Sequence, residues 1–175
     1  MKCDDIHSFR AWACGNFVDN LNRGSFAEWL VGCALGVIEE NAPRKEWDLC
    51  DFHYNGRKIE VKCSGLGQAW DSGKPSTPRF DIEQRKEEWY AATNKRKKLD
   101  PPRRTADIDV FCLHEAIPAT NENVADRSRW KFWVVSTNTI NEKLGGQKSL
   151  GCRTLNQLAK FIPWENIKTA VDRCP

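Results

Sequence analysis

The chain has 175 residues, with 27 Lys and Arg against 24 Asp and Glu, and is 40% hydrophobic and 29% charged. This length favours one domain, and the composition is typical of a globular protein that does not enter a membrane. No run of about 18 uninterrupted apolar residues occurs, which argues against a transmembrane helix. The first five residues also lack the apolar core of a secretory signal. We therefore expect a single cytoplasmic domain covering residues 1–175.

The eight cysteines are scattered along the chain. None forms a CxxC pair, and no Cys and His residues have the spacing of a zinc finger. Several lie in apolar stretches, such as Cys33 and Cys112, where a free thiol behaves as a small hydrophobic side chain. The sequence predicts free cysteines rather than a disulfide framework.

The first clear helix signal is Ser25-Phe26-Ala27-Glu28, which has the form of a capping box with Ser25 at the N-cap and Glu28 at N3. It predicts a buried helix from Phe26 to about Leu35 that ends at Gly36. Residues 1–22 give only a weak helical pattern.

Two strand patterns follow, Leu49–Tyr54 and Arg57–Cys63, and Asn55-Gly56 between them is the strongest short signal for a β-hairpin. Helix and strand patterns then alternate, which favours an α/β fold. The remaining expected elements are short strands at 80–82, 107–113 and 130–135, and helices at 82–92, 137–144, 154–161 and from Pro163 onward.

A two-residue turn at Asn55-Gly56 fixes which side chains share a face of the hairpin. The expected apolar face carries Phe52, Tyr54, Ile59, Val61 and Cys63. The expected polar face carries Asp51, His53, Lys58, Glu60 and Lys62. In this register Asp51 lies opposite Glu60, with Cβ atoms about 5 Å apart. Two carboxylates so close require either protonation of one or a cation between them.

Two carboxylates are the hard oxygen ligands that Mg²⁺ accepts, with water and phosphate oxygens completing its coordination. The Lys62 ammonium, two residues beyond Glu60, could orient a water or offset charge on a phosphate. This spacing suggests metal-assisted hydrolysis of phosphodiester bonds. The alternative is a surface hairpin whose exposed face is simply charged.

Residues 85–104 carry eight Lys or Arg and three Asp or Glu, close to Trp89 and Tyr90. Such a segment could follow a phosphate backbone and stack rings on bases, or it could be a solvated, mobile segment. The candidate nucleic-acid contacts within it are Lys95, Arg96, Lys97, Lys98, Arg103 and Arg104.

Asp51, Gly56 and Ile59-Glu60-Val61-Lys62 together resemble the PD-(D/E)XK signature of the restriction-endonuclease-like nucleases. Gly24–Leu30 lies where these proteins place their first helix, and Glu28 matches a frequent carboxylate of that helix. Ser64 and Gln68 match polar positions that often follow the lysine. The sequence departs from the signature at Cys50, which stands where a proline is usual.

The resemblance implies a restriction-endonuclease-like fold with a central four- to five-stranded mixed sheet flanked by helices. It further implies a Mg²⁺-dependent DNA endonuclease, with Mn²⁺ able to substitute, acting on double-stranded DNA. Asp51, Glu60 and the carbonyl of Val61 would bind the metal, and Lys62 would position or activate the water. Glu28 and Gln68 would belong to the catalytic site, and Ser64 would contact the nucleic acid.

Several alternatives stay open at this level. Asp48 could replace Asp51 as the metal ligand if a β-bulge changes the face on which Asp51 lies. The same fold could serve as a non-catalytic nucleic-acid-binding module, and its target could be RNA. Symmetric cutting of a duplex requires two active sites, which would suit a homodimer.

Overall fold

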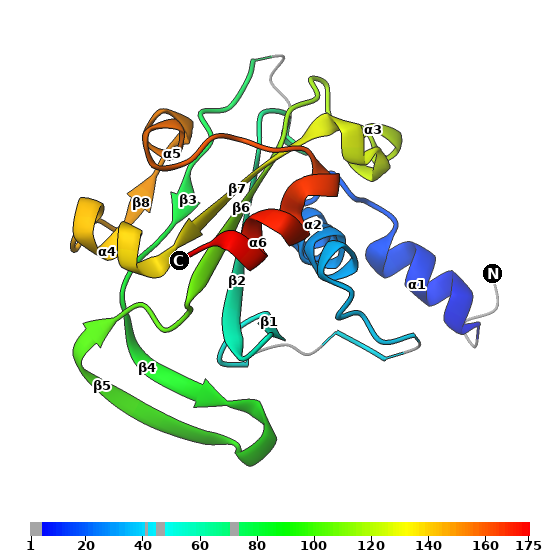
Figure 1. Ribbon diagram of the computed structural model, residues 1–175. Coiled ribbons are helices and arrows are strands. Elements are labelled where there is room, and N and C mark those ends of the chain that lie inside the picture. The colour runs from blue at the N-terminus through cyan, green and yellow to red at the C-terminus, as the bar shows by residue number, and fades with distance from the viewer. Residues whose placement is uncertain (1–4, 41, 45–47, 71–73) are drawn as a thin grey trace.

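The centre of the molecule is a four-stranded mixed sheet of the order β1-β2-β6-β7 (Figure 1). A computed structural model describes residues 5–40, 42–44, 48–70 and 74–175. The strands are β1 (Phe52–Tyr54), β2 (Arg57–Gly65), β6 (Ile108–His114) and β7 (Trp130–Ser136). β2 pairs antiparallel with β1 and parallel with β6, and β6 pairs antiparallel with β7. The protein is therefore α/β, as expected, with four strands in this sheet.

The β1–β2 hairpin follows from its turn residues. Asn55 and Gly56 have φ angles of 49° and 76°, the left-handed conformation that a two-residue turn of this kind requires. The resulting register pairs Tyr54 with Arg57, His53 with Lys58 and Phe52 with Ile59. The predicted register is confirmed over these three pairs.

One face of the sheet packs on α2 (Asn20–Leu35) and α6 (Ile167–Arg173). Tyr54, Ile59 and Val61 are buried in this core, and Phe52 and Cys63 pack against it. These are the five residues of the expected apolar face. Their burial turns Glu60 and Lys62, the alternate residues of β2, toward the opposite side of the sheet.

The opposite face carries a second core, built around Phe111, Trp133 and Val135 of the sheet. It is covered by a small sheet of β3 (Phe80–Asp81) and β8 (Ser149–Leu150), and by α4 (Thr137–Leu144) and α5 (Cys152–Leu158) (Figure 1). Glu60, Lys62 and Asp109 lie on this face, beside the apolar core rather than inside it.

Helix α2 begins earlier than the capping-box pattern predicted. Asp19 is its N-cap and accepts a hydrogen bond from Leu21 N–H, so Ser25 and Glu28 lie inside the helix. Ser25 Oγ instead donates to the Leu21 carbonyl one turn back. The prediction that Glu28 is an N3 residue is therefore wrong. The predicted end is confirmed, because Gly36 adopts φ 72° as the C-cap.

The segment predicted as a helix at 82–92 is a strand. β4 (Arg85–Tyr90) pairs antiparallel with β5 (Lys95–Arg103), and together they form a long hairpin that extends away from the central sheet (Figure 1). We call residues 85–103 the β4–β5 arm. Its residues favour helices locally, but pairing places Glu87 opposite Lys98 and Glu88 opposite Lys97. The backbone pairing of the two strands thus overrides local helix propensity, and Glu87 lies 3.7 Å from Arg96 across the ribbon.

The other helices are short: α1 (Ile6–Cys14), α3 (Asn121–Ala125) and three 3₁₀ turns at Ala91–Thr93, Arg127–Arg129 and Trp164–Asn166. Pro163 is the N-cap of the last of these turns, which leads into α6. The seven cysteines that the structure describes are free thiols, as predicted, and Cys3 lies outside the described residues. In the described part of the chain, no helix combines the length and the apolar character that crossing a membrane requires.

Two glycines of α2 should respond oppositely to alanine. Gly36→Ala should lower the free energy of unfolding by about 1–2 kcal/mol, because φ 72° is unfavourable for a residue with a Cβ atom. Gly24→Ala should raise it by up to about 1 kcal/mol, because a Cβ there meets no atom within 4 Å and alanine favours the helix. Urea denaturation of both variants measures the two effects. Equal shifts in one direction would contradict this account of the helix end.

Candidate active site

Asp51 lies in a bend immediately before β1, at the edge of the central sheet. Its N–H donates to the Ile59 carbonyl (3.1 Å), and its carboxylate accepts the N–H of Val61 (2.6 Å). Regular pairing starts only at Phe52, so Asp51 is not the direct cross-strand neighbour of Glu60 that the register predicted. The bend turns the carboxylate toward the backbone of β2, next to the residue that follows Glu60.

The surroundings of Asp51 disfavour the ionised form of its carboxyl group. Burial, together with the nearby Glu60 and Glu28 carboxylates, raises the pKa of this carboxyl to about 7, against the lowering effects of the Val61 N–H and Lys62. Glu60, Glu28 and Lys62 are therefore each close enough to Asp51 to change its pKa. Asp48 instead accepts a hydrogen bond from the adjacent Leu49 N–H (2.8 Å). Of the two candidate aspartates, Asp51 is thus the one beside Glu60.

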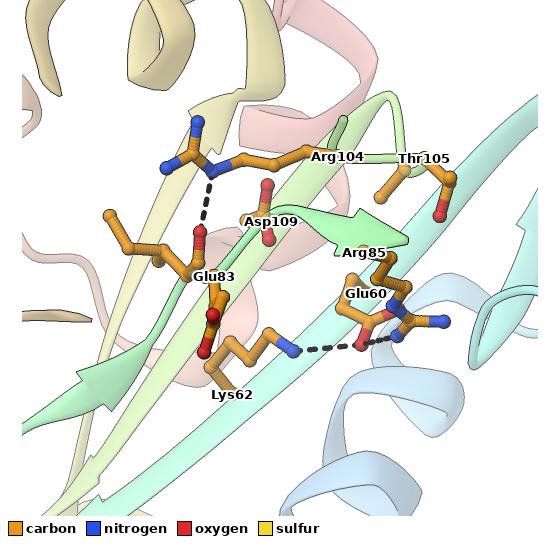
Figure 2. Close-up of a pocket in the computed structure, with 9 residues that line it drawn as sticks. Glu60, Lys62, Glu83, Arg85, Arg104, Thr105 and Asp109 are labelled. Atoms are coloured by element: carbon orange, nitrogen blue, oxygen red, sulfur yellow. Dashed lines mark hydrogen bonds and ion pairs between the residues drawn. The ribbon is translucent and has the colours of Figure 1, made fainter. Parts of the chain in front are cut away.

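Glu60 is the centre of a charged cluster on β2, formed with Lys62 and Arg85. Its Oε1 atom accepts from Lys62 Nζ (2.8 Å) and from Arg85 Nη2 (2.5 Å), and the residue is only 8% exposed. Figure 2 shows Lys62 and Arg85 approaching this carboxylate from two sides. The sequence did not single out Arg85 as part of the site, because Arg85 comes from β4, 25 residues away.

Asp109 is the parallel neighbour of Glu60 across the β2–β6 pair. Burial raises its pKa to about 6, while the Thr137 hydroxyl (2.8 Å) and the charge of Lys62 favour its ionised form. The sequence predicted the strand that carries Asp109 but indicated no functional role for this residue. A carboxylate within the otherwise apolar run 108–113 was the available signal. A pocket in this region is lined by Glu60, Lys62, Glu83, Arg85, Arg104 and Asp109, among others (Figure 2).

Glu28 reaches the site from α2. Its carboxylate forms a two-point ion pair with Arg44, at 2.5 Å from Nε and 2.6 Å from Nη2. Glu28 therefore does not cap α2, and its counter-ion is Arg44. Its effect on the pKa of Asp51 indicates that it lies near that carboxylate.

Gln68 does not join this cluster. Its amide donates to the Gly65 carbonyl (3.0 Å) and to Ser76 Oγ (3.0 Å), and its oxygen accepts from the buried Arg23 (3.0 Å). Gly65 is five residues beyond Glu60 on β2, roughly 16 Å along an extended strand. Gln68 thus stabilises a loop at the far end of β2, and its catalytic role stays a prediction. Ser64 does share the face of Glu60 and Lys62, by the alternation of β2.

Arg104 also differs from the expectation that it contacts nucleic acid. Its guanidinium donates to the carbonyls of Ile82 (2.7 Å), Gly145 (2.9 Å) and Gln147 (2.8 Å), and to Asn141 Oδ1 (2.7 Å). These bonds use most of its donors, so Arg104 fixes the base of the β4–β5 arm. Lys95, Arg96, Lys97, Lys98 and Arg103 are exposed on the arm, as a nucleic-acid contact requires.

The residues fit a divalent metal only in part as they stand. Within residues 5–40, 42–44, 48–70 and 74–175, no group of three or more His, Cys, Asp or Glu side chains is placed to hold an ion. Glu60 and Glu28 are directed to Lys62, Arg85 and Arg44. Yet Mg²⁺ needs only one or two carboxylates together with water and substrate oxygens. A cation would relieve the unfavourable charge on Asp51 next to Glu60, so these two carboxylates fit Mg²⁺ provided that Glu60 exchanges its ion pairs for the metal.

A scan against models of known protein families finds no match, and a search of curated proteins finds none either. The function must therefore be argued from the site itself.

The raised pKa of Asp51 makes folding stability depend on pH. The folded protein holds this proton up to about pH 7, whereas the unfolded chain releases it near the ordinary value of 3.8. The contribution of Asp51 to the free energy of unfolding therefore falls as the pH rises through this window. Asp51→Asn should be more stable than wild type by on the order of 1–4 kcal/mol at about pH 8, and the difference should vanish near pH 4.

Chemical denaturation of both proteins across this pH range measures the difference. A constant difference at all pH values would show that Asp51 is ionised normally in the folded protein.

Proposed function

We propose that this protein is a Mg²⁺-dependent nuclease of the PD-(D/E)XK type that hydrolyses phosphodiester bonds in DNA. The observation that carries the proposal is the placement of Asp51, Glu60 and Lys62 around one short stretch of β2, where the Asp51 carboxylate binds the Val61 N–H. The resemblance predicted that these three residues form one site. The mixed sheet flanked by helices supports the restriction-endonuclease-like fold within this proposal. A cytoplasmic location and duplex DNA as the substrate stay predictions, and a homodimer stays one of the open alternatives.

Asp51 and Glu60, with the carbonyl of Val61, would hold the metal. A bound Mg²⁺ would polarise a phosphate oxygen and lower the pKa of a water molecule. Lys62 lies 2.8 Å from the Glu60 carboxylate, so its ammonium is available to orient the attacking water and to stabilise negative charge on the phosphate. The low exposure of Glu60 strengthens these charge interactions.

The surrounding cations supply the attraction for a phosphate. Lys62, Arg85 and Arg104 line the same pocket, and two of them converge on the single Glu60 carboxylate. Arg104 is committed to backbone carbonyls, whereas Lys62 and Arg85 each have further N–H donors beyond those they give to Glu60. A phosphate would therefore meet donors that are already held at the site.

Glu60→Gln and Lys62→Ala should each lower DNA cleavage by about 100-fold or more while the protein stays folded. Glu83→Gln is the matched control, because Glu83 lines the same pocket but pairs with the exposed Lys148 (2.8 Å). Cleavage of plasmid and short duplex substrates with Mg²⁺ or Mn²⁺, with circular dichroism for folding, measures these effects. Undiminished cleavage by both site variants would refute the proposal.

A second candidate function is a non-catalytic nucleic-acid-binding module. It is favoured by the ion pairs that Glu60 makes with both Lys62 and Arg85, which hold the carboxylate without a metal. The two functions differ in metal binding. Calorimetric titration of Mg²⁺ should give a signal for wild type and Glu83→Gln but not for Glu60→Gln if the protein is a nuclease. Absence of metal binding by wild type, with and without duplex DNA, would favour the second function.

Arg85→Ala should bind Mg²⁺ more tightly than wild type, by about tenfold, because the Glu60 carboxylate loses one of its two positive neighbours. Arg79→Ala is a matched control, since Arg79 is exposed and donates to Ser149 instead. Titration calorimetry compares the three dissociation constants. Weaker binding by Arg85→Ala would show that the arginine supports the metal site rather than competing with it.

A further inference from the structure

The β4–β5 arm is a two-stranded antiparallel ribbon that extends from the body beside the candidate site (Figure 1). Arg85, its first residue, is bonded to Glu60, and Arg104 directly follows its last residue. β4 has six residues, which span about 20 Å in an extended strand. One end of the arm is therefore attached to the site, and the other reaches well beyond it.

The charge on the arm is predominantly positive, on both of its faces. Lys95, Arg96, Lys97 and Lys98 are consecutive and exposed, so two cations project from each face of the ribbon. The paired strand offers few acids in return. Glu87 is 3.7 Å from Arg96, and Glu88 is buried and accepts from Tyr90 Oη (2.9 Å). Mutual repulsion of the remaining cations opposes this arrangement unless a polyanion neutralises it.

Aromatic rings lie among these cations toward the tip. Trp89 is paired with Arg96 and Tyr90 with Lys95, and the Arg96 guanidinium lies 5.0 Å from the centroid of the Trp89 ring. This contact orients the guanidinium over an indole face. The tip thus offers rigid polar and aromatic groups in addition to a diffuse positive charge.

We propose that the β4–β5 arm is the element that binds duplex DNA, by lying in a groove of the B-form helix with its cations on the phosphates. The proposal rests on the nuclease function above and adds the surface and the form of the substrate. The major groove of B-DNA is wide enough for a two-stranded β-ribbon. The major groove of an RNA duplex is too narrow for this, and a single strand has no groove.

The position of the arm also sets the distance between binding and cleavage. A reach of about 20 Å corresponds to at most about six base pairs along the helix axis, because a groove is inclined to that axis. Contacts from Lys95 and Arg96 near the tip therefore fall within about six base pairs of a phosphate bound at Glu60. The arm binds one side of the cleavage position within this distance.

The test is duplex binding in the absence of divalent metal, so that no cleavage is required. Fluorescence anisotropy with a labelled DNA duplex compares wild type with the triple variant Arg96→Gln/Lys97→Gln/Lys98→Gln. The matched control is Lys143→Gln/Arg153→Gln/Lys160→Gln, which removes three exposed positive charges outside the arm. We expect the arm variant to bind on the order of tenfold more weakly, with a salt dependence of log K reduced by up to about 2.7, and the control to bind like wild type.

Arg96→Lys tests whether the loss of affinity comes from the loss of positive charge. This variant keeps the cation and should retain most of the affinity. Unfolding curves verify that the arm variant is folded. Wild-type-like binding by the folded arm variant would overturn the proposal, as would equal or tighter binding of wild type to single-stranded DNA or duplex RNA.

These outcomes are separate from the nuclease proposal. Binding through the arm without any cleavage by wild type would refute the catalytic function but support DNA binding by the arm. Cleavage by the arm variant at wild-type efficiency would refute DNA binding by the arm but support the catalytic function.

Discussion

The hydrogen bond from the Val61 N–H to the Asp51 carboxylate is the contact on which the candidate site depends (2.6 Å). It replaces a backbone ladder bond at the sheet edge, so β1 is short and Asp51 sits in a bend. The same bond fixes a carboxylate next to Glu60 without requiring the two to be cross-strand neighbours. A charged acceptor makes such a bond stronger than its neutral counterpart, which helps to hold an otherwise unfavourable charge in place.

Negative and positive groups in this region are interdependent. Asp51 and Asp109 both have raised pKa values because they are buried, and Glu60 raises both further. Lys62 counteracts this in each case and is itself bonded to Glu60. Such a cluster is sensitive to any ligand that changes its charge balance. A cation would stabilise the ionised aspartates, whereas a phosphate would draw on Lys62 and Arg85, so metal and substrate complement each other.

The parts predictable from sequence were those set by local chemistry. Asn55-Gly56 specified its turn, and the turn specified which residues of β2 face the apolar core. The helix predicted at 82–92 failed because its residues favour a helix locally, while their partners in β5 become visible only after the chain folds back. The start of α2 failed for a related reason, since Asp19 supplied a better cap than Ser25. Arg85 and Asp109 were missed because proximity to Glu60 is created by packing and not by spacing.

The anchoring of the arm has a consequence for the thermodynamics of association. At the base of the arm, Arg104 follows β5 and donates to three backbone carbonyls, while Arg85 at the start of β4 binds Glu60. Much of the conformational entropy of the ribbon is therefore lost when the protein folds, before any ligand arrives. Association then has to immobilise mainly the long side chains near the tip, which lowers its entropic cost. The ribbon is therefore preorganised for association, and Arg85 links it directly to the Glu60 carboxylate.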